Sequence, residues 1–242
     1  MTTSTISNKA KNLIFLKKKN FNIPKLSIFN CNDFNKNSDI IIGKIQKEYK
    51  NKIAVRSSSK NEDGLKYSYA GKYKSFVNIN PKDTNLLKQK IKEVIKSYKN
   101  NHNIFFIQSM VQNIDLSGVV LTRDLNSYNP YFVINYHKGS DSTLVTSGQK
   151  KTNSIKYFPN PKYQINDKFK NLIKISLQLK KIYGCEIDIE FCINKKGKVF
   201  IVQVRKLNLQ KNVGTKYLSS KIFGNHLANL EKKIIKLKKK QN

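Results

Sequence analysis

The sequence predicts an α+β fold with a largely antiparallel sheet component, and two features support this prediction. Short runs that alternate between apolar and polar residues, as half-buried strands do, are interspersed with amphipathic helices. The clearest example is the stretch 186–207, in which two strand-like runs flank the turn residues 194–197. We expect this stretch to form a hairpin, which pairs its two strands antiparallel.

The remaining elements follow from the same patterns in chain order. Helices are predicted at 8–19, 39–50, 83–100, 167–183 and 217–240, where apolar residues recur every three or four positions. Further strands are predicted at 26–29, 53–55, 104–110, 116–122 and 131–136. Gly184 is expected to end the fourth helix. Ser117 and Gly118 lie inside a predicted strand, which indicates that something approaches the backbone closely there.

The hairpin also carries the first chemical hypothesis. Asp188 and Glu190 share one face of the first strand, and Gln203 and Arg205 share one face of the second, because side chains two apart point the same way. If those faces coincide, carboxylate and amide oxygens meet in one patch, and these suit a hard cation such as Mg2+. An arginine beside them suits a phosphate. The alternative is a surface hairpin with an ordinary cross-strand Glu–Arg pair.

Size and composition exclude several classes of protein. The chain has 242 residues, enough for one large domain or two small lobes. It has no run of 18 apolar residues and no apolar core near its first residue, so neither a membrane span nor a secretory signal is expected. Cys31, Cys185 and Cys192 lack the spacing of metal ligands. We therefore expect free thiols and a cytoplasmic protein.

The charge is strongly positive, at +32, and taken alone it suggests a polyanionic partner. Only three of the 47 basic residues are arginines, and lysine, asparagine and isoleucine are all over-used, which indicates a compositional bias. Non-specific binding to polyanions is expected, but no nucleic-acid-binding motif is present. The three arginines are Arg56, Arg123 and Arg205. A chain that uses lysine almost everywhere keeps arginine where a planar, bidentate donor is hard to replace.

Two further features suggest contacts with phosphate. Arg56 follows a predicted strand and opens the hydroxyl-rich loop at the start of 56–79, which could cover a phosphate or could be an ordinary exposed loop. Lys9 lies in the first turn of a predicted helix, where it could contact an anion or remain a solvated charge.

Four motifs, in this order, resemble the nucleotide-binding domain of the pyruvate phosphate dikinase and phosphoenolpyruvate synthase family. They read KAKNL with FNIP, AVRSSSKNEDGLKYSYAGKYKSFVNI, FFIQSMVQNIDLSGVVLTRD and DIEFCINKKGKVFIVQVR. The resemblance covers about residues 9–207 and implies an ATP-grasp fold, in which two lobes hold ATP between them. It places this domain at 1–210, with the small lobe roughly within 1–105, and leaves a basic C-terminal helix or tail at 211–242.

The resemblance also implies roles for individual residues. Lys9 and Arg56 would contact ATP phosphates, and Arg205 would contact the terminal phosphate, so that the two arginines take the catalytic roles. Glu190 and Gln203 would hold Mg2+, with Asp188 supporting or sharing that site. Gln108 and Met110 would flank the adenine. These roles agree with the chemistry of the residues, because phosphoryl transfer depends mostly on positioning and charge neutralisation.

The sequence departs from the family pattern in several places. Ser7-Asn8 replaces a glycine pair, Lys72 a glutamine and Lys206 a proline. Asn135 and the loop 137–148 replace a glutamate and a glycine-rich loop with its own glutamate. The family passes the phosphoryl group through a histidine on a separate swivelling domain, in a Gly-Gly-x-x-Ser-His-Ala motif. None of the three histidines, His102, His137 and His226, has that context.

The leading hypothesis is therefore an ATP-dependent phosphotransferase subunit of the dikinase type. It would bind Mg-ATP, split it and phosphorylate a histidine on a partner protein, for onward transfer to a small acceptor bound elsewhere, pyruvate or another molecule. One alternative is a non-catalytic ATP-binding or sensing module. The other is a basic nucleic-acid-binding protein.

Overall fold

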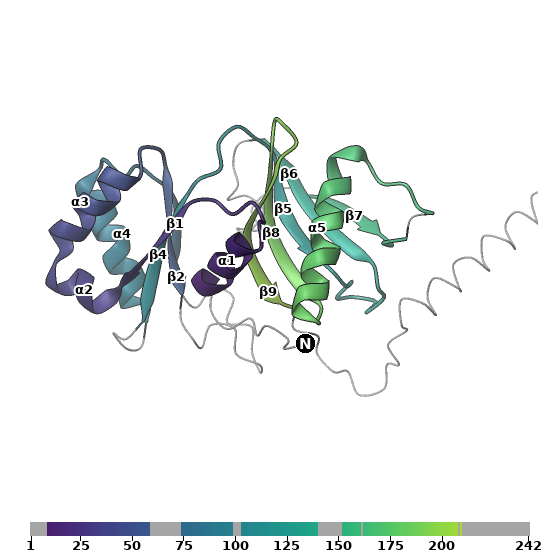
Figure 1. The fold of residues 1–242 in the computed structure, drawn as a ribbon, viewed down its shortest axis with the longest axis horizontal. Coiled ribbons are helices and arrows are strands. Elements are labelled where there is room, and N and C mark those ends of the chain that lie inside the picture. Colours follow the sequence, from purple (N-terminus) through teal and green to yellow (C-terminus); the bar gives the residue numbers. More distant parts are fainter. Residues whose placement is uncertain are drawn as a thin grey trace, which may run out of the picture.

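The computed structural model describes residues 9–58, 74–98, 103–139, 152–160, 162–207 and 209. These residues form two lobes, each built on an antiparallel sheet with helices packed against it (Figure 1). The helices are α1 Lys9–Lys18, α2 Cys31–Lys36, α3 Ser38–Glu48, α4 Thr84–Lys96 and α5 Asp167–Tyr183. The strands are β1 Leu26–Asn30, β2 Ile53–Ser58, β3 Ser75–Ile79, β4 Ile104–Ser109, β5 Ile114–Leu121, β6 Phe132–Lys138, β7 Asn153–Tyr157, β8 Ile187–Asn194 and β9 Val199–Lys206.

The smaller lobe has a four-stranded sheet in the order β1-β4-β2-β3, in which every neighbouring pair is antiparallel. Helices α2, α3 and α4 cover one face of this sheet, on the side away from the other lobe (Figure 1). The core between them includes Phe34, Ile91 and Phe105, which are almost fully buried. Helix α4 begins where the Asp83 carboxylate accepts a hydrogen bond from the Leu86 amide, at 2.9 Å.

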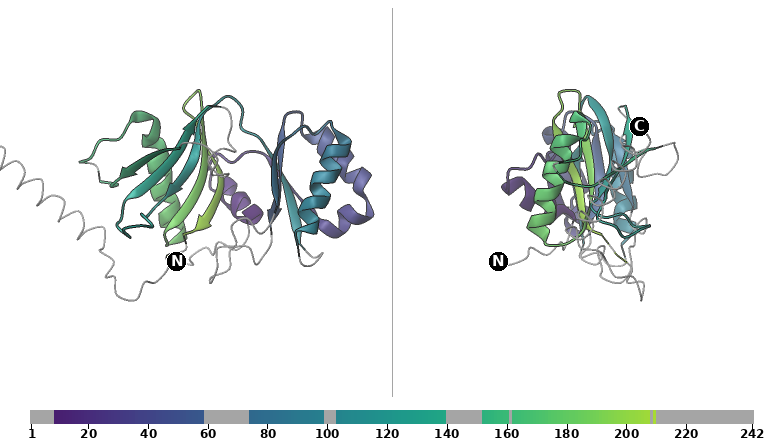
Figure 2. Two further views of the ribbon diagram at one scale, coloured as in Figure 1. Left: turned by 180° about the vertical axis from the view of Figure 1, so that it is seen from behind. Right: turned by 90° about the vertical axis from the view of Figure 1, so that its right-hand side faces the viewer.

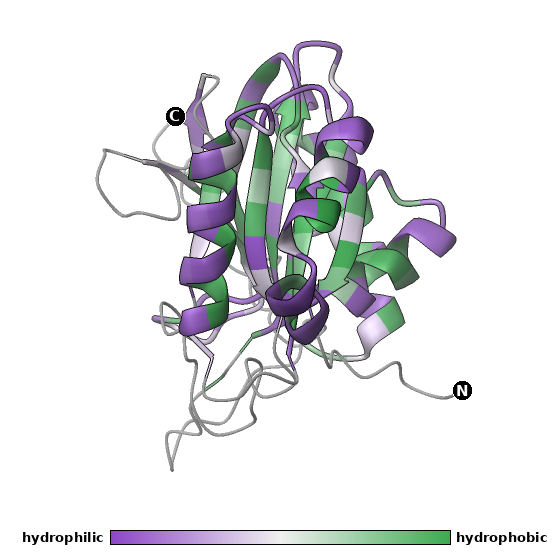
Figure 3. Cartoon of the chain, turned by 90° about the vertical axis from the view of Figure 1, so that its left-hand side faces the viewer, coloured by the Kyte–Doolittle hydropathy of each residue, from purple (hydrophilic) through white to green (hydrophobic). Residues whose placement is uncertain are grey.

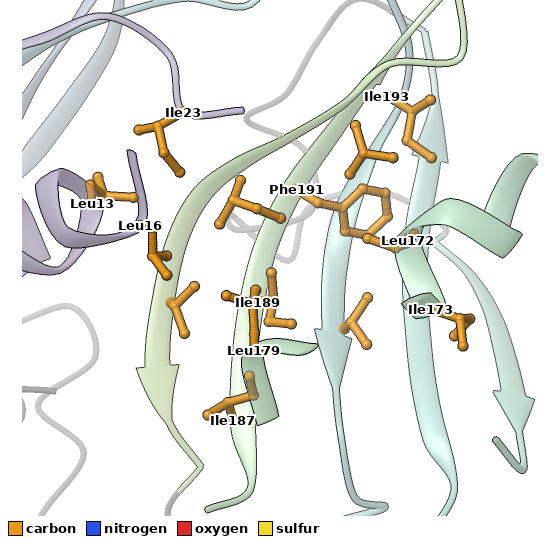
Figure 4. Close-up of a cluster of buried hydrophobic side chains, with 14 of the residues drawn as sticks. Leu13, Leu16, Ile23, Leu172, Ile173, Leu179, Ile187, Ile189, Phe191 and Ile193 are labelled. Atoms are coloured by element: carbon orange, nitrogen blue, oxygen red, sulfur yellow. The ribbon is translucent and has the colours of Figure 1, made fainter. Parts of the chain in front are cut away.

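The larger lobe has a five-stranded antiparallel sheet in the order β7-β6-β5-β8-β9. Helix α5 packs on one face, where Leu172 and Leu179 lie against side chains of β8 such as Ile189 and Phe191 (Figure 4). The helix ends at Gly184, whose left-handed backbone, with φ of 63°, favours glycine. In Figure 3 the strands are mainly hydrophobic, whereas the helices also carry many hydrophilic residues. The opposite face of the sheet carries Glu190, which contacts Arg56 of the smaller lobe.

Helix α1 precedes the smaller lobe in sequence but packs with the core of the larger one. Its residues Ala10, Leu13 and Leu16 are fully buried in the same cluster as the core of β8 and β9. The helix lies beside β9 in both views of the ribbon (Figures 1 and 2). The Ile201 amide of β9 donates to the Asn22 carbonyl, at 2.9 Å. The N-terminal segment thus covers the edge strand of the larger sheet, which would otherwise expose unpaired backbone groups.

The close approach expected at Ser117-Gly118 is confirmed at Gly118. A Cβ added there would collide with the Asn135 carbonyl on the neighbouring strand β6. The neighbour is part of the sheet itself, so a side chain at this position would push β5 and β6 apart.

The fold class is confirmed: the molecule is α+β, with two largely antiparallel sheets in two lobes. The helix expected at 167–183 has the predicted bounds, and the other helices and strands expected before it lie within a few residues of their predictions. The prediction missed α2, β3 and β7, and it placed Arg56 behind a strand although β2 continues to Ser58. The helix expected at 217–240, most of the loop 56–79 and most of the loop 137–148 lie outside the described residues. In the described part of the chain, no helix combines the length and apolar character needed to cross a bilayer.

Candidate functional site

The candidate site is a cleft between the two sheets. The smaller lobe contributes Ala54 and Val77, and the larger lobe contributes Val202. Met110 and Val111 come from the segment that joins β4 of the smaller lobe to β5 of the larger one. These side chains make an apolar slot, and polar residues also line it, namely Arg56, Gln108, Ser109 and Glu190. An apolar slot with a few convergent polar groups is the usual form of a small-molecule site.

The register of the hairpin brings its two polar faces together. Glu190 of β8 pairs with Gln203 of β9, and Asp188 pairs with Arg205. The register shifts between Glu190 and Phe191, so Val202 is an extra residue on β9. As a result, Val202 lines the cleft and the next residue, Gln203, also faces it. The coincidence of faces on which the sequence hypothesis depended is therefore present.

Arg56 reaches this patch from the other lobe. Its Nη1 donates to Gln203 Oε1 at 3.1 Å and to Glu190 Oε2 at 3.4 Å, and its Nη2 donates to the same Glu190 oxygen at 3.3 Å. The Arg56 side chain is 13% exposed and that of Glu190 is 14% exposed. The structure thus brings together, across the cleft, residues that are 134 and 147 positions apart in sequence.

Arg205 and Asp188 form a second pair on the same hairpin. Arg205 Nη2 donates to Asp188 Oδ2 at 2.6 Å, and the Arg205 side chain is 30% exposed. The pair lies two residues along each strand from Glu190 and Gln203, and therefore on the same face of the hairpin.

Gln108 and Met110 lie at the point where β4 leaves the smaller lobe. Gln108 is buried, and its Nε2 donates to the Val202 carbonyl of the other lobe at 3.4 Å. The Met110 amide donates to the Lys52 carbonyl at 3.0 Å, while the residue lines the cleft. Both residues therefore border the apolar slot, as expected of residues that flank a base.

Lys9 lies at the N-terminus of α1, beside the end of β2. The amide of the next residue, Ala10, donates to Ser58 Oγ at 3.1 Å. This contact fixes the start of the helix two residues beyond Arg56 along the strand. Helix N-termini favour anions, so the position is consistent with a phosphate contact.

The patch fits a hard cation. Two oxygens from neighbouring strands, one carboxylate and one amide, converge on a single cationic nitrogen of Arg56. Mg2+ is commonly held by one or two protein oxygens together with phosphate and water oxygens. In the described ranges, no group of three or more His, Cys, Asp or Glu residues that could hold a metal occurs.

Two donors at the patch are left unused. Among the described residues, no hydrogen-bond partner exists for Arg56 Nε or Gln203 Nε2, and both atoms are buried. A buried donor without a partner costs free energy, and native structures contain few of them. These atoms are therefore available to a ligand that enters the cleft.

The sequence hypothesis missed Cys192, which also lines the cleft. It follows Glu190 by two residues, so the period of the strand places it on the same face and could have revealed it. The pKa of the Cys192 thiol is raised to about 12, because the effect of burial outweighs the lowering by Arg56, and Glu190 adds a smaller increase. The thiol thus remains protonated near neutral pH and acts as a small apolar surface in the slot.

Arg123, the third arginine, makes its hydrogen bonds away from the cleft. Its Nε donates to Glu186 Oε1 at 3.1 Å and its Nη1 to the Tyr128 carbonyl at 2.6 Å, both within the larger lobe. Arg123 therefore joins the end of β5 to the start of β8.

Comparison with known proteins gives a family and a fold. A family model described as "Pyruvate phosphate dikinase, AMP/ATP-binding domain" matches residues 32–156 and 133–219, which together make up more than half of the chain. The prodigiosin synthesizing transferase PigC of Serratia marcescens is 22% identical over 203 residues, with 65% of this chain and 23% of that protein covered.

Among solved structures, the D-alanyl-alanine synthetase A of Vibrio cholerae is similar, with a TM-score of 0.50 at 12% identity over 92% of this chain and 64% of that one. The D-alanine-D-alanine ligase of Helicobacter pylori has a TM-score of 0.48 at 10% identity, covering 83% of this chain and 54% of that one. The chain spans less than a quarter of the length of PigC and just under two thirds of the synthetase. At these identities the solved structures bear on the fold alone.

Proposed function

The chain belongs to the family of pyruvate phosphate dikinase AMP/ATP-binding domains and has the ATP-grasp fold, and we propose that it acts as a Mg-ATP-dependent phosphotransferase subunit. ATP would lie between the lobes, and a phosphoryl group split from it would pass to a histidine on a partner protein. From there it would pass to a small acceptor, pyruvate or another molecule, bound elsewhere.

One observation carries this proposal: Arg56 meets Glu190 and Gln203 across the cleft between the lobes. A guanidinium, a carboxylate and an amide at one buried point can neutralise a polyphosphate and hold its metal. An ordinary surface hairpin would instead show an exposed cross-strand pair.

Each site residue takes a role in positioning or in charge neutralisation. Arg56 and Lys9 would contact the phosphates from the smaller lobe and from α1, and Arg205 would contact the terminal phosphate from the hairpin. Glu190 and Gln203 would hold Mg2+, with Asp188 orienting Arg205 through their 2.6 Å contact. When bound, the metal neutralises charge that develops on the transferred group. Gln108 and Met110 would border the base.

We propose a partner protein that carries the phosphorylated histidine because of the sequence context of the histidines in this chain. None of its three histidines lies in a Ser-His-Ala sequence, and His137 is followed by lysine and glycine. PigC, of which the chain covers 23%, is by its name a transferase that synthesizes prodigiosin. That name supports transfer to a small molecule and leaves its identity open.

Calorimetric titration of Mg-ATP into the purified chain tests the nucleotide site. Glu190→Ala and Arg205→Ala are each expected to weaken saturable binding at least tenfold, which is about 1.4 kcal/mol. Glu93→Ala is the matched control. Glu93 lies on α4, on the side of the smaller sheet away from the cleft (Figure 1), and its carboxylate pairs with Lys74 and Lys90. Equal binding by all four proteins would contradict the assignment of the cleft.

Phosphoryl transfer needs a separate measurement. With labelled ATP and a separate chain that carries a Ser-His-Ala domain, acid-labile label is expected on that chain and to be lost with Glu190→Ala. Binding without transfer to any candidate chain would favour the second candidate, a non-catalytic ATP-binding or sensing module. One observation favours that candidate: Asn135 shares a cross-strand row with Glu190 through Val119, and it stands where the family has a glutamate.

A nucleic-acid-binding function has charge alone in its favour. It predicts tight, salt-sensitive binding that survives replacement of Arg56, Glu190 and Arg205. Binding that is lost with those residues would instead belong to the cleft.

A further inference from the structure

The cleft contains a cation that belongs to the chain itself. Arg56 Nη1 lies within 3.1 Å of Gln203 Oε1 and 3.4 Å of Glu190 Oε2, the two oxygens best placed to hold Mg2+. The guanidinium therefore stands where a bound cation would have to make its contacts. Its positive charge would also repel a divalent ion that approached the same two oxygens.

The contacts between Arg56 and Glu190 are long for a charged hydrogen-bonded pair. Both terminal nitrogens of Arg56 share one oxygen of Glu190, at 3.3 and 3.4 Å, whereas a bidentate pair uses both oxygens at about 2.7–2.9 Å. Arg56 Nε and Gln203 Nε2, both buried, have no hydrogen-bond partner among the residues described. A phosphate group could engage the guanidinium more completely than Glu190 and Gln203 do here.

The contact also joins the two lobes. Arg56 lies on β2 of the smaller sheet, and its acceptors lie on β8 and β9 of the larger one. Among the described residues that line the cleft, Arg56 is the one positively charged side chain. Movement of its side chain toward a phosphate would release both oxygens in one step.

We propose that Arg56 acts as a tethered cation that occupies the metal-binding oxygens in the nucleotide-free chain and excludes divalent metal until phosphate draws it away. This inference rests on the proposed function, because it takes Glu190 and Gln203 as the metal ligands. It deepens that function by giving the order of events: free Mg2+ does not load the empty cleft, and the metal enters with the nucleotide.

The test measures Mn2+ binding to the nucleotide-free chain by electron paramagnetic resonance, with Mn2+ as the probe in place of Mg2+. Arg56→Met removes the charge and is expected to bind Mn2+ at least tenfold more tightly than the unchanged chain. Arg56→Lys retains a positive charge and is expected to keep affinity near that of the unchanged chain. Adding Glu190→Gln to Arg56→Met is expected to abolish the gain.

Lys88→Met is the matched control, because it removes one positive charge from a surface pair with Asp39 on the smaller lobe. It should leave Mn2+ affinity unchanged. Circular dichroism confirms that each variant is folded, and Arg56→Gln replaces Arg56→Met if the latter does not fold. An equal gain in Lys88→Met would show a general charge effect and overturn the proposal.

A parallel titration of ATP into the unchanged chain separates the two ideas. If ATP binds but Arg56→Met binds Mn2+ no better than the unchanged chain, the tethered-cation proposal fails and the proposed function stands. If ATP does not bind at all, the proposed function fails. A tenfold gain that depends on Glu190 supports the proposal.

Discussion

Two arginine–carboxylate clusters in this molecule have nearly equal burial but different degrees of satisfaction. In the scaffold cluster, Arg123 and Glu186 have side chains that are 11% and 12% exposed, and in the cleft cluster, Arg56 and Glu190 are 13% and 14% exposed. Burial and residue type are therefore matched.

The scaffold cluster makes several short hydrogen bonds, and within the described residues none of its buried side-chain atoms is left without a partner. Glu186 accepts from Arg123 Nε at 3.1 Å, from Lys180 Nζ at 2.9 Å and from Thr122 Oγ1 at 2.7 Å. Arg123 also donates from Nη1 to the Tyr128 carbonyl at 2.6 Å. In the cleft cluster, the contacts are 3.1–3.4 Å, and Arg56 Nε and Gln203 Nε2 have no partner among the described residues.

The difference shows which arginine is kept for the fold and which for a ligand. The scaffold cluster joins elements of one lobe, where the partners stay in place, so complete pairing stabilises the native state. The cleft cluster joins two lobes around a space, and its incomplete pairing leaves donors for whatever enters. Local rules are most often broken at functional sites, and this cluster fits that pattern.

The largest expected difference is in stability. Arg123→Met should lower the free energy of unfolding by about 1–3 kcal/mol, because Glu186 and the Tyr128 carbonyl each lose a buried donor while Lys180 remains as a counter-charge for Glu186. Urea unfolding measures this change, with Lys88→Met as the surface control. A loss below about 1 kcal/mol would mean that the two clusters do not differ as the geometry indicates.

Double-mutant cycles compare the two pairs directly. Coupling between Arg123 and Glu186 should exceed coupling between Arg56 and Glu190 by about 0.5 kcal/mol or more. The first pair is in contact at 3.1 Å, whereas the contacts of the second pair are 3.3 and 3.4 Å long. Each cycle uses Met for arginine and Gln for glutamate, with unfolding free energy as the readout. Equal coupling energies would remove the distinction.

Nucleotide binding should reverse the ranking of the two arginines. Arg56→Met should weaken Mg-ATP binding at least tenfold, about 1.4 kcal/mol, and should lower the unfolding free energy less than Arg123→Met does, because its contacts with Glu190 are longer. Arg123→Met, studied at a temperature where it is folded, should bind Mg-ATP like the unchanged chain. Calorimetry and urea unfolding on the same samples give both quantities.

The smallest expected effect is a pH dependence of the scaffold. Burial raises the pKa of Asp124, but hydrogen bonds from Lys156, the Asn126 amide and Ser127 outweigh it, so the pKa lies below its ordinary value. A lowered pKa in the folded state contributes stability above the unfolded pKa, and this contribution is lost as the pH falls through the folded value. Unfolding midpoints should therefore drop less between about pH 5 and about pH 3 in Asp124→Asn than in the unchanged chain. An identical drop in both would contradict the role of Asp124.

Much of the fold could be predicted from the sequence because its signals are local. The apolar period of 167–183 and the glycine after it determine α5, and the alternation from 187 to 193 determines β8. The three missed elements, α2, β3 and β7, lack such signals, and β3 buries only Ile79. Helix α2 has six residues and buries only Cys31 and Phe34, and β7 is an edge strand of mostly exposed residues.

The sequence by itself determined which residues of the hairpin share a face, since side chains alternate along any strand. It also determined the family, because four motifs occur in order. Tertiary structure alone decided that Glu190 lies opposite Gln203, because an extra residue at Val202 sets that register. It alone also brought Arg56 to them, 134 residues from Glu190 along the chain. Such contacts depend on how two sheets face each other, and no local pattern in the chain encodes that distance.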